Sequence, residues 1–131
     1  MAFIAWKPEY SVGSVMLDAQ HKQLVEMIND LHESMQKRSD PARIRKILDD
    51  LIGYTRLHFA QEEKTMERAG YPDLAEHQKI HRSLVAQVEE MRAKHETGSA
   101  TFTLKLKDFL KQWLLQHILQ DDMRYSPYLK N

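Results

Sequence analysis

The sequence predicts an all-α fold, an antiparallel up-down-up-down four-helix bundle with an extended N-terminal arm. Only four glycines and four prolines interrupt the 131 residues, and leucine, lysine, glutamate, glutamine and methionine, which favour helices, are frequent. Apolar residues recur at alternating spacings of three and four, as they do along the seam of a helix bundle. The connections are short, which favours antiparallel neighbours. We expect one domain over residues 1–131, because a chain of this length buries a sufficient core by itself.

The first expected elements are an arm over residues 1–16 and a helix over residues 18–37. The arm has no periodicity, and we expect aromatic side chains such as Trp6 to pack it against the bundle. Asp18 is the expected start of the helix. The seam of this helix is formed by Leu17, His21, Leu24, Ile28, Leu31 and Met35. A histidine therefore occupies a position that the pattern assigns to the core.

The second expected helix covers residues 41–69. Asp40 supplies an N-cap acceptor, and Pro41 needs no amide donor at the first helical position. Gly70 supplies the left-handed residue that ends many helices. The seam reads Ile44, Leu48, Leu51, Thr55, His58, Glu62 and Ala69. His58 and Glu62 thus continue an apolar stripe.

The third and fourth expected helices cover residues 73–96 and 101–123. Asp73 and Glu76 form a capping box at the start of the third, and Gly98 ends it. The seam of the third helix contains Leu74, His77, His81, Leu84, Val88, Met91 and His95. The broad stripe of the fourth contains Phe102, Leu106, Phe109, Leu110, Trp113, Leu114, His117 and Ile118. Each helix again carries histidine on its apolar face.

Six of these polar seam residues are expected at the same end of the bundle. In an up-down-up-down arrangement the start of the first helix, the end of the second, the start of the third and the end of the fourth lie together. These four places hold His21, His58, Glu62, His77, His81 and His117. His32 lies about 16 Å further along the axis than His21, at 1.5 Å per residue. We therefore assign His32 and the distant His95 to structural or surface roles.

Composition excludes several classes of function. The 19 basic and 19 acidic side chains balance, so no net charge attracts nucleic acid or an anionic membrane. Cysteine is absent, which excludes disulfides, thiolate metal sites and cysteine nucleophiles. The N-terminus does not have the pattern of a signal peptide, and no segment approaches the length of a membrane span. We expect a cytoplasmic protein that is a monomer.

The polar cluster has the chemistry of a metal site. Six unpaired ionisable groups in a core would cost several kcal/mol each, which argues against a metal-free interaction module. Five imidazoles with a carboxylate exceed the four ligands of zinc. Two six-coordinate ions that share bridging carboxylates would use them all. Imidazole with carboxylate suits iron, and ligand type does not exclude copper, manganese or nickel.

These residues closely resemble the hemerythrins, most of all the bacterial single-domain members, and the resemblance covers essentially the whole chain. It rests on D-x-Q-H ending at His21, His58-Phe59 followed by Glu62-Glu63 and Met66, Tyr71-Pro72, His77-x-x-x-His81, and His117-Ile118 with Asp122 and Tyr125. The combination is highly specific. It implies a non-haem di-iron centre with an oxo or hydroxo bridge that binds dioxygen reversibly.

The resemblance also assigns the ligands. It implies that His77, His81 and His117 hold one iron, that His21 and His58 hold the other with one position open, and that Glu62 and Asp122 bridge the two. Spacing alone favours Asp121, which lies one α-helical turn after His117, whereas Asp122 is rotated by about 140°. The family pattern H-x-x-x-x-D selects Asp122. We expect the helix to loosen there so that this carboxylate turns inward.

By the same resemblance, apolar side chains surround the open position and exclude water. The matching residues are Leu24, Phe59, Trp113, Leu114 and Leu119. The expected function is oxygen storage, delivery or sensing, with an oxygen-consuming enzyme as a recipient and no catalytic residue. The alternative is a di-iron enzyme of the peroxidase, oxidase or nitric oxide reductase type on the same bundle. The Glu-x-x-His pairs of ferritin-like oxidising centres are missing at this site, which favours reversible binding.

Overall fold

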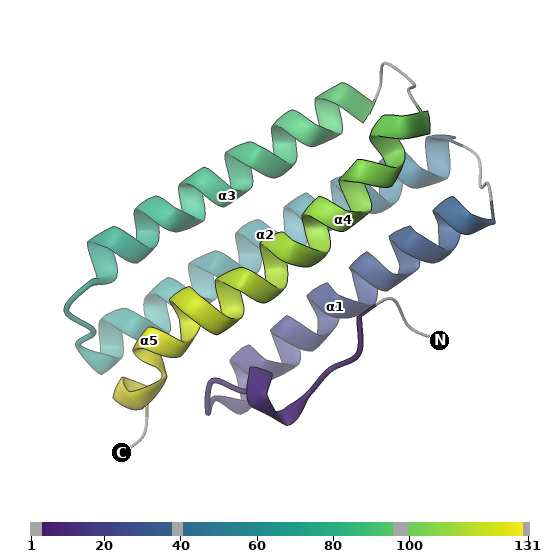
Figure 1. The fold of residues 1–131 in the computed structure, drawn as a ribbon. Coiled ribbons are helices and arrows are strands. Elements are labelled where there is room, and N and C mark those ends of the chain that lie inside the picture. The colour runs from purple at the N-terminus through teal and green to yellow at the C-terminus, as the bar shows by residue number, and fades with distance from the viewer. Residues whose placement is uncertain (1–3, 38–40, 96–99, 130–131) are drawn as a thin grey trace.

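The computed structural model describes residues 4–37, 41–95 and 100–129, and in these ranges the chain is helical without strands. The four long helices are α1 (Val15–Gln36), α2 (Pro41–Ala69), α3 (Leu74–His95) and α4 (Ala100–Gln116). Each runs antiparallel to the next along the chain (Figure 1). Helix α1 contacts α2 and α4, and α3 contacts the same two helices. This arrangement confirms the predicted four-helix bundle.

Short elements complete both ends of the chain. A single 3₁₀ turn, η1 (Pro8–Tyr10), lies in the N-terminal arm. Helix α4 continues directly into a π-helical turn, η2 (His117–Asp122), which is followed by α5 (Met123–Tyr125) and the 3₁₀ turn η3 (Ser126–Leu129). The Ser126 hydroxyl donates a hydrogen bond to the Val12 carbonyl at 2.7 Å. The two terminal segments are therefore joined at one end of the bundle.

Helix α1 begins three residues earlier than Asp18, the predicted start. Ser14 is the N-cap, and its hydroxyl accepts a hydrogen bond from the Leu17 N–H at 3.2 Å. The Asp18 carboxylate accepts instead from the Val12 N–H at 2.8 Å and from the Ser11 hydroxyl at 2.5 Å. Asp18 thus fastens the arm to the bundle. An aspartate near the start of a helix is equally typical of an N-cap, so the sequence alone does not distinguish the two roles.

Helix α2 ends as the sequence predicts. Gly70 has a φ of 71°, a left-handed conformation that favours glycine. Its N–H donates to the Glu67 carbonyl at 3.1 Å, and the Tyr71 N–H donates to the Met66 carbonyl at 3.0 Å. These bonds satisfy the last carbonyls of the helix. Two other predicted cap residues, Asp40 and Gly98, lie outside the described residues, as does the side chain of His95.

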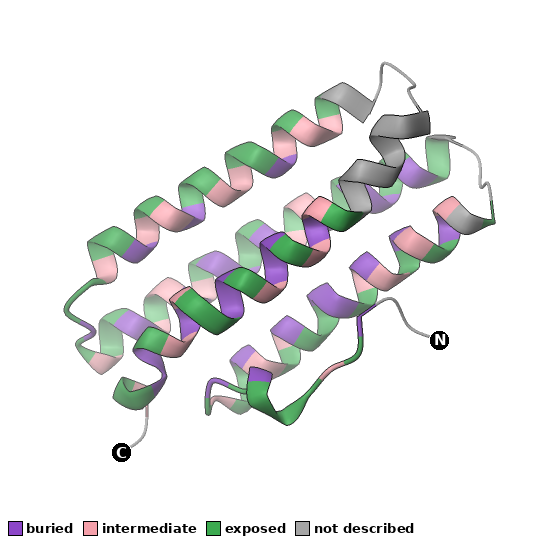
Figure 2. Ribbon diagram, viewed as in Figure 1, coloured by how far each residue is buried: buried purple, intermediate pink, exposed green. Residues whose placement is uncertain are grey.

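Two apolar clusters are buried along the bundle axis, and the inner faces of the helices are buried accordingly (Figure 2). The larger contains Leu24, Ile28, Leu31, Leu48, Leu51, Phe59, Trp113 and Leu114 among others. The smaller contains Val12, Leu17, Met66, Tyr71 and Tyr125. Along α1, His21 lies between Leu17 of one cluster and Leu24 of the other. The histidine-rich layer is therefore closed by hydrocarbon from both directions.

Among the described residues, none of the helices combines the length and the apolar character that crossing a membrane requires.

Candidate metal centre

The π-helical turn η2 decides which aspartate faces the bundle interior. Hydrogen bonding from i to i+5 widens the turn, so residues five apart share one face. His117 and Asp122 are five apart and are both buried, with 3% and 0% of their surfaces exposed. Asp121 remains within reach of the same imidazole, with its Oδ2 2.8 Å from His117 Nδ1. The chain thus places both aspartates beside His117, on opposite edges of its ring.

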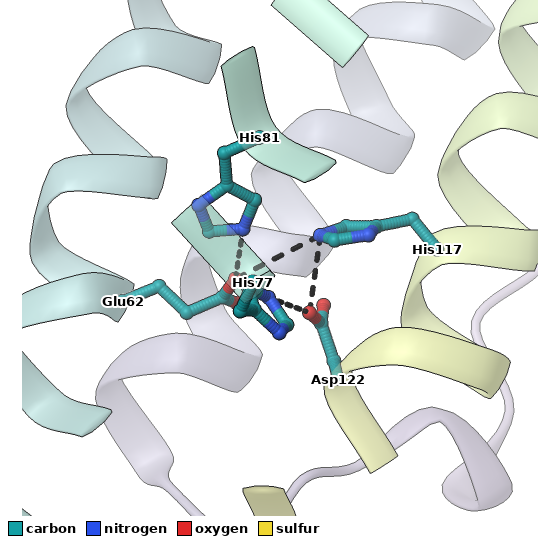
Figure 3. A group of neighbouring side chains, drawn as sticks. All are labelled: Glu62, His77, His81, His117 and Asp122. Carbon is teal, nitrogen blue, oxygen red and sulfur yellow. Dashed lines mark hydrogen bonds and ion pairs between the residues drawn. The ribbon is translucent and has the colours of Figure 1, made fainter. Parts of the chain in front are cut away.

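The structure brings together all seven predicted metal ligands. They come from α1, α2, α3 and η2, and none is more than 3% exposed. The seven are His21, His58, Glu62, His77, His81, His117 and Asp122. Figure 3 shows five of them converging in the bundle interior. Their ligand atoms form two groups that share Glu62, and in each group the atoms lie within 4.8 Å of one another.

The first group lies on the α3 and η2 side of Glu62 (Figure 3). Glu62 Oε1 is 2.8 Å from His81 Nε2, 3.3 Å from His77 Nε2 and 3.8 Å from His117 Nε2. Asp122 Oδ1 is 3.2 Å from His77 Nε2 and 3.1 Å from His117 Nε2. We call His77, His81 and His117 the three-histidine position. One oxygen of each carboxylate faces it.

The second group lies on the α1 side. Glu62 Oε2 is 3.2 Å from His21 Nε2 and 3.2 Å from His58 Nε2. Asp122 Oδ2 is 3.1 Å from His21 Nε2. We call His21 and His58 the two-histidine position. Each carboxylate therefore divides its two oxygens between the two positions, which is the geometry of a bridging ligand between two ions.

Unpartnered polar atoms show that the cluster fits metal ions. Both oxygens of Asp122 and the Nε2 atoms of His58 and His117 are buried and have no hydrogen-bond partner within the described parts of the chain. Buried polar groups without partners are destabilising and rare. The same atoms are ordinary ligands of a borderline transition-metal ion. Metal binding would satisfy them together.

Carboxylates hold the outer ring nitrogens of two histidines in the three-histidine position. Glu63 Oε2 is 2.8 Å from His81 Nδ1, and Asp121 Oδ2 is 2.8 Å from His117 Nδ1. A carboxylate accepts hydrogen bonds, so each Nδ1–H is the donor and each Nε2 lone pair points inward. Periodicity does not reveal this outer role, because Glu63 lies off the apolar seam and the spacing of Asp121 favours it as an inner ligand instead. The Glu62-Glu63 pair and the spacing of four from His117 to Asp121 are the signals that identify them.

The two-histidine position has a different outer partner. His58 Nδ1 donates to the amide oxygen of Gln20 at 2.7 Å, whereas His21 Nδ1 is buried without a hydrogen-bond partner in the described chain. Gln20 belongs to the D-x-Q-H motif, although the sequence does not say which histidine it contacts. The outer partner on this side is neutral.

Tyr125 orients the shared glutamate. Its hydroxyl donates to Glu62 Oε2 at 2.8 Å, and the side chain is fully buried. Burial and the charges of Asp122 and Glu62 raise the pKa of this phenol far above its usual value. The hydroxyl therefore stays protonated and remains a donor. Tyr125 was part of the sequence motif, but only the fold shows that it contacts Glu62 across 63 residues of chain.

In the metal-free chain the carboxylates draw protons onto the histidines. Burial by itself lowers the pKa of His21 and His77, but the nearby carboxylates of Asp122 and Glu62 outweigh burial and raise each pKa to about 9. The pKa of His117 is also raised, because Asp122 and other carboxylates outweigh burial. Protons and metal ions therefore compete for the same nitrogen atoms.

The pKa values of Glu62, Asp122 and His58 are lowered instead. Burial opposes ionisation of Glu62, yet the charge of His58 and hydrogen bonds from other histidines lower the pKa of this carboxyl well below its usual range. The pKa of Asp122 is also lowered, since His117 and His21 outweigh burial and the charge of Glu62. Burial lowers the pKa of His58. Both carboxylates thus remain anionic.

Apolar groups border the cluster on the side of the larger apolar core. The Phe59 ring stacks parallel to the His81 ring with centroids 3.8 Å apart, and it lies 5.4 Å from the His117 ring and 5.8 Å from the His58 ring. Four of the five predicted pocket residues are buried: Leu24, Phe59, Trp113 and Leu114. Phe59, a member of the larger apolar cluster, therefore contacts histidines of both positions.

The fifth predicted pocket residue, Leu119, does not fit that role. It is 44% exposed, whereas Ile118 beside it is fully buried. In the wide turn η2 the inward positions are taken by His117, Ile118 and Asp122. Leu119 accordingly points to the surface, and the expectation that it lines a buried pocket is corrected by the structure.

Comparison with known proteins gives one consistent result. Residues 12–129 match the sequence profile of the Hemerythrin HHE cation binding domain. Bacteriohemerythrin from Pseudomonas aeruginosa is 39% identical over 95% of this chain and 80% of its own length. Bacteriohemerythrin from Methylococcus capsulatus is 34% identical over 98% of each chain. The matched region includes every residue of the cluster.

Solved structures agree with the sequences. A wild-type hemerythrin crystal structure superposes with a TM-score of 0.86 at 31% identity, covering 99% of this chain and 100% of the other. A mutant of hemerythrin in which a leucine is replaced by alanine gives a TM-score of 0.87 with full coverage of both chains. The likeness thus extends over the whole bundle.

Proposed function

Because the chain belongs to the hemerythrin family, we propose that it binds dioxygen reversibly at a non-haem di-iron centre, for oxygen storage, delivery or sensing. The observation that carries the proposal is the division of two carboxylates between two sets of histidines. Glu62 and Asp122 each direct one oxygen to the three-histidine position and the other to the two-histidine position. A single ion would not use this arrangement.

The residues of the cluster have distinct tasks in this proposal. His77, His81 and His117 hold one ion, and His21 and His58 hold the other, with Glu62 and Asp122 between them. The two-histidine position thus has one protein ligand fewer, which leaves room for a small molecule. The iron pair, when bound, supplies the electrons and the open coordination position that dioxygen requires. An oxo or hydroxo bridge would complete the pair.

The surroundings support binding rather than catalytic turnover. Phe59, Trp113 and Leu114 are buried in the apolar cluster next to the histidines. The Trp113 N–H is already bonded to the Leu84 carbonyl at 3.3 Å. Hydrocarbon around a metal site limits the access of water. A site built in this way protects a bound gas molecule and offers no catalytic acid from these side chains.

The proposal includes a cytoplasmic monomer that supplies an oxygen-consuming enzyme. The balanced charge supports a freely diffusing carrier, because no net charge draws the chain to a membrane surface. Cell fractionation and sedimentation of the purified protein test these two points directly.

Metal analysis combined with optical spectra tests the central proposal. We expect two iron ions per chain, no haem, and a spectrum that changes on aeration and returns under vacuum over repeated cycles. One zinc per folded chain would refute the di-iron centre. Steady consumption of oxygen with a reducing substrate, without return to the starting spectrum, would favour the di-iron enzyme instead.

A pair of leucines one turn apart tests the water-excluding role. Leu114 precedes His117 by three residues, and Leu110 lies one turn earlier on the same helix, and both are fully buried or nearly so. Either replacement by alanine should cost about 2–5 kcal/mol of stability. Leu114→Ala should hasten loss of the oxygenated form, measured as spectral decay in air, whereas Leu110→Ala should leave that rate unchanged. Equal decay rates in the two variants would remove Leu114 from the pocket.

A further inference from the structure

The two metal positions differ in the charge of the groups behind their histidines. Two imidazoles of the three-histidine position donate from Nδ1 to the carboxylates of Glu63 and Asp121, both at 2.8 Å. In the two-histidine position, His58 donates to the neutral amide of Gln20 at 2.7 Å. The outer charge is therefore concentrated on one side of the pair.

An imidazole that donates to a carboxylate is a stronger electron donor than one that donates to an amide. The anion attracts the Nδ1 proton and shifts electron density toward Nε2, the atom that binds the metal. Greater density at Nε2 strengthens the bond to any cation and favours a higher oxidation state. Removing such an outer partner typically weakens metal binding by about 10- to 100-fold.

We propose that Glu63 and Asp121 are positioning residues that make the three-histidine position the tighter and more readily oxidised of the two, so that the ions bind and leave in a fixed order. The inference rests on the proposed di-iron function. The ion at the three-histidine position binds first and leaves last. The ion at the two-histidine position, backed by Gln20, keeps the weaker donors and the room for a ligand.

Both carboxylates are placed so that they can be altered without disturbing the core. Glu63 and Asp121 are 26% and 25% exposed in their side chains. Glu63 and His81 line a surface cavity of about 390 Å³ between α2 and α3. Asp121 and His117 line another of about 280 Å³ beside α4 and η2. Isosteric changes at these edges remove charge but little packing.

Chelator competition on the iron-loaded protein under nitrogen tests the proposal. Wild-type protein should release its two ions in two separate steps as the chelator concentration rises. Glu63→Gln and Asp121→Asn should each move the second step by about 10- to 100-fold and leave the first in place. Gln20→Glu should move only the first step, in the opposite direction. Glu67→Gln, at an exposed position one turn after Glu63, should change neither.

Redox potentials supply a readout that packing alone would not change. For a one-electron couple, each tenfold loss of preference for the ferric ion corresponds to a rise of about 59 mV. Glu63→Gln and Asp121→Asn should therefore raise the potential of the iron pair, and Gln20→Glu should lower it. Thermal unfolding of each loaded variant tests whether any change reflects damage to the bundle.

The outcomes separate the two proposals. Wild-type protein that holds fewer than two irons would contradict the di-iron function itself. Two irons with unchanged release steps in Glu63→Gln and Asp121→Asn would overturn the inference alone. Equal displacement of both steps, or a shift of the same sign in Gln20→Glu, would show that these residues act on the bundle and not on one position.

Discussion

Two regions of helix α2 are buried to the same extent for opposite physical reasons. Leu48 and Leu51 are fully buried in the larger apolar cluster, and His58 and Glu62, about two to four turns further along the same stripe, are fully buried as well. Burial of a leucine side chain contributes about 1.5–3 kcal/mol without any partner. Burial of an ionised group costs several kcal/mol unless it is paired. Burial of the apolar region is therefore favourable without a ligand, whereas the metal centre requires bound ions to offset the cost of burying its charged groups.

The bundle tolerates the metal centre because apolar clusters lie on both sides of it. Leu17 and Met66 close one end and Leu24 and Phe59 the other. Metal binding then adds stability by mass action, about 4 kcal/mol when free metal exceeds its dissociation constant a thousandfold. Substitutions in the metal centre should consequently change the stabilisation that metal provides, whereas substitutions in the apolar region should not.

Replacement of Glu62 should have the largest effect on this difference. Glu62→Ala removes oxygens from both positions at once, so iron content should fall from two per chain to nearly none. The loaded wild type should then exceed the variant in unfolding free energy by about 4 kcal/mol under saturating iron. Iron analysis and urea unfolding measure both quantities.

A core variant at the other region is the matched control. Leu48→Ala should cost about 2–5 kcal/mol, since Leu48 is fully buried, while iron content stays at two per chain. Loss of iron from Leu48→Ala, or retention of both ions by Glu62→Ala, would mean that the two regions are not energetically separate.

Changes in pH should move the loaded and metal-free proteins in opposite directions. The raised pKa of His21 and His77, about 9 against 6.5, means that folding binds protons. That contribution is complete below about pH 6.5 and is lost as pH rises through about 9. Metal-free protein should therefore become less stable over this range. The loaded protein should instead lose iron as pH falls, because protons compete for the imidazoles.

Urea unfolding at pH 6.5, 7.5 and 9, with and without iron, measures the two trends. Leu48→Ala should show the same pH dependence as the wild type, because its site contains no titrating group. Parallel trends in the loaded and metal-free proteins would argue that the histidines do not hold the iron.

The smallest effect is expected for a pair of opposite charges that is exposed to solvent. Arg92 donates from Nε to Asp49 Oδ1 at 2.7 Å, and the two side chains are 31% and 53% exposed. The hydrogen bond and charge of Arg92 lower the pKa of Asp49. Exposed pairs contribute about 0–1 kcal/mol, so Asp49→Asn should shift the unfolding midpoint slightly and leave iron binding unchanged. A loss above 2 kcal/mol would show that exposure is not what separates the two regions.

Local sequence patterns predicted the helices of this protein and several of its site residues. Three-four periodicity predicted the helices, and Gly70 predicted the end of α2, because backbone preferences and one-sided burial act over a few residues. His58 and Glu62 stood out for the same reason, as polar residues on an apolar stripe. The expected convergence of the four helix ends then required only short connections.

Tertiary structure decided what local rules leave open. Periodicity favours Asp121 as the inward residue and the family pattern favours Asp122; the π-helical turn directs Asp122 inward and leaves Asp121 behind His117. The same turn places Leu119 at the surface. Likewise Asp18 fastens the arm while Ser14 caps α1. Such choices depend on contacts between segments distant in the chain, such as Tyr125 with Glu62, and the spacing of neighbouring residues does not encode the free energy of those contacts.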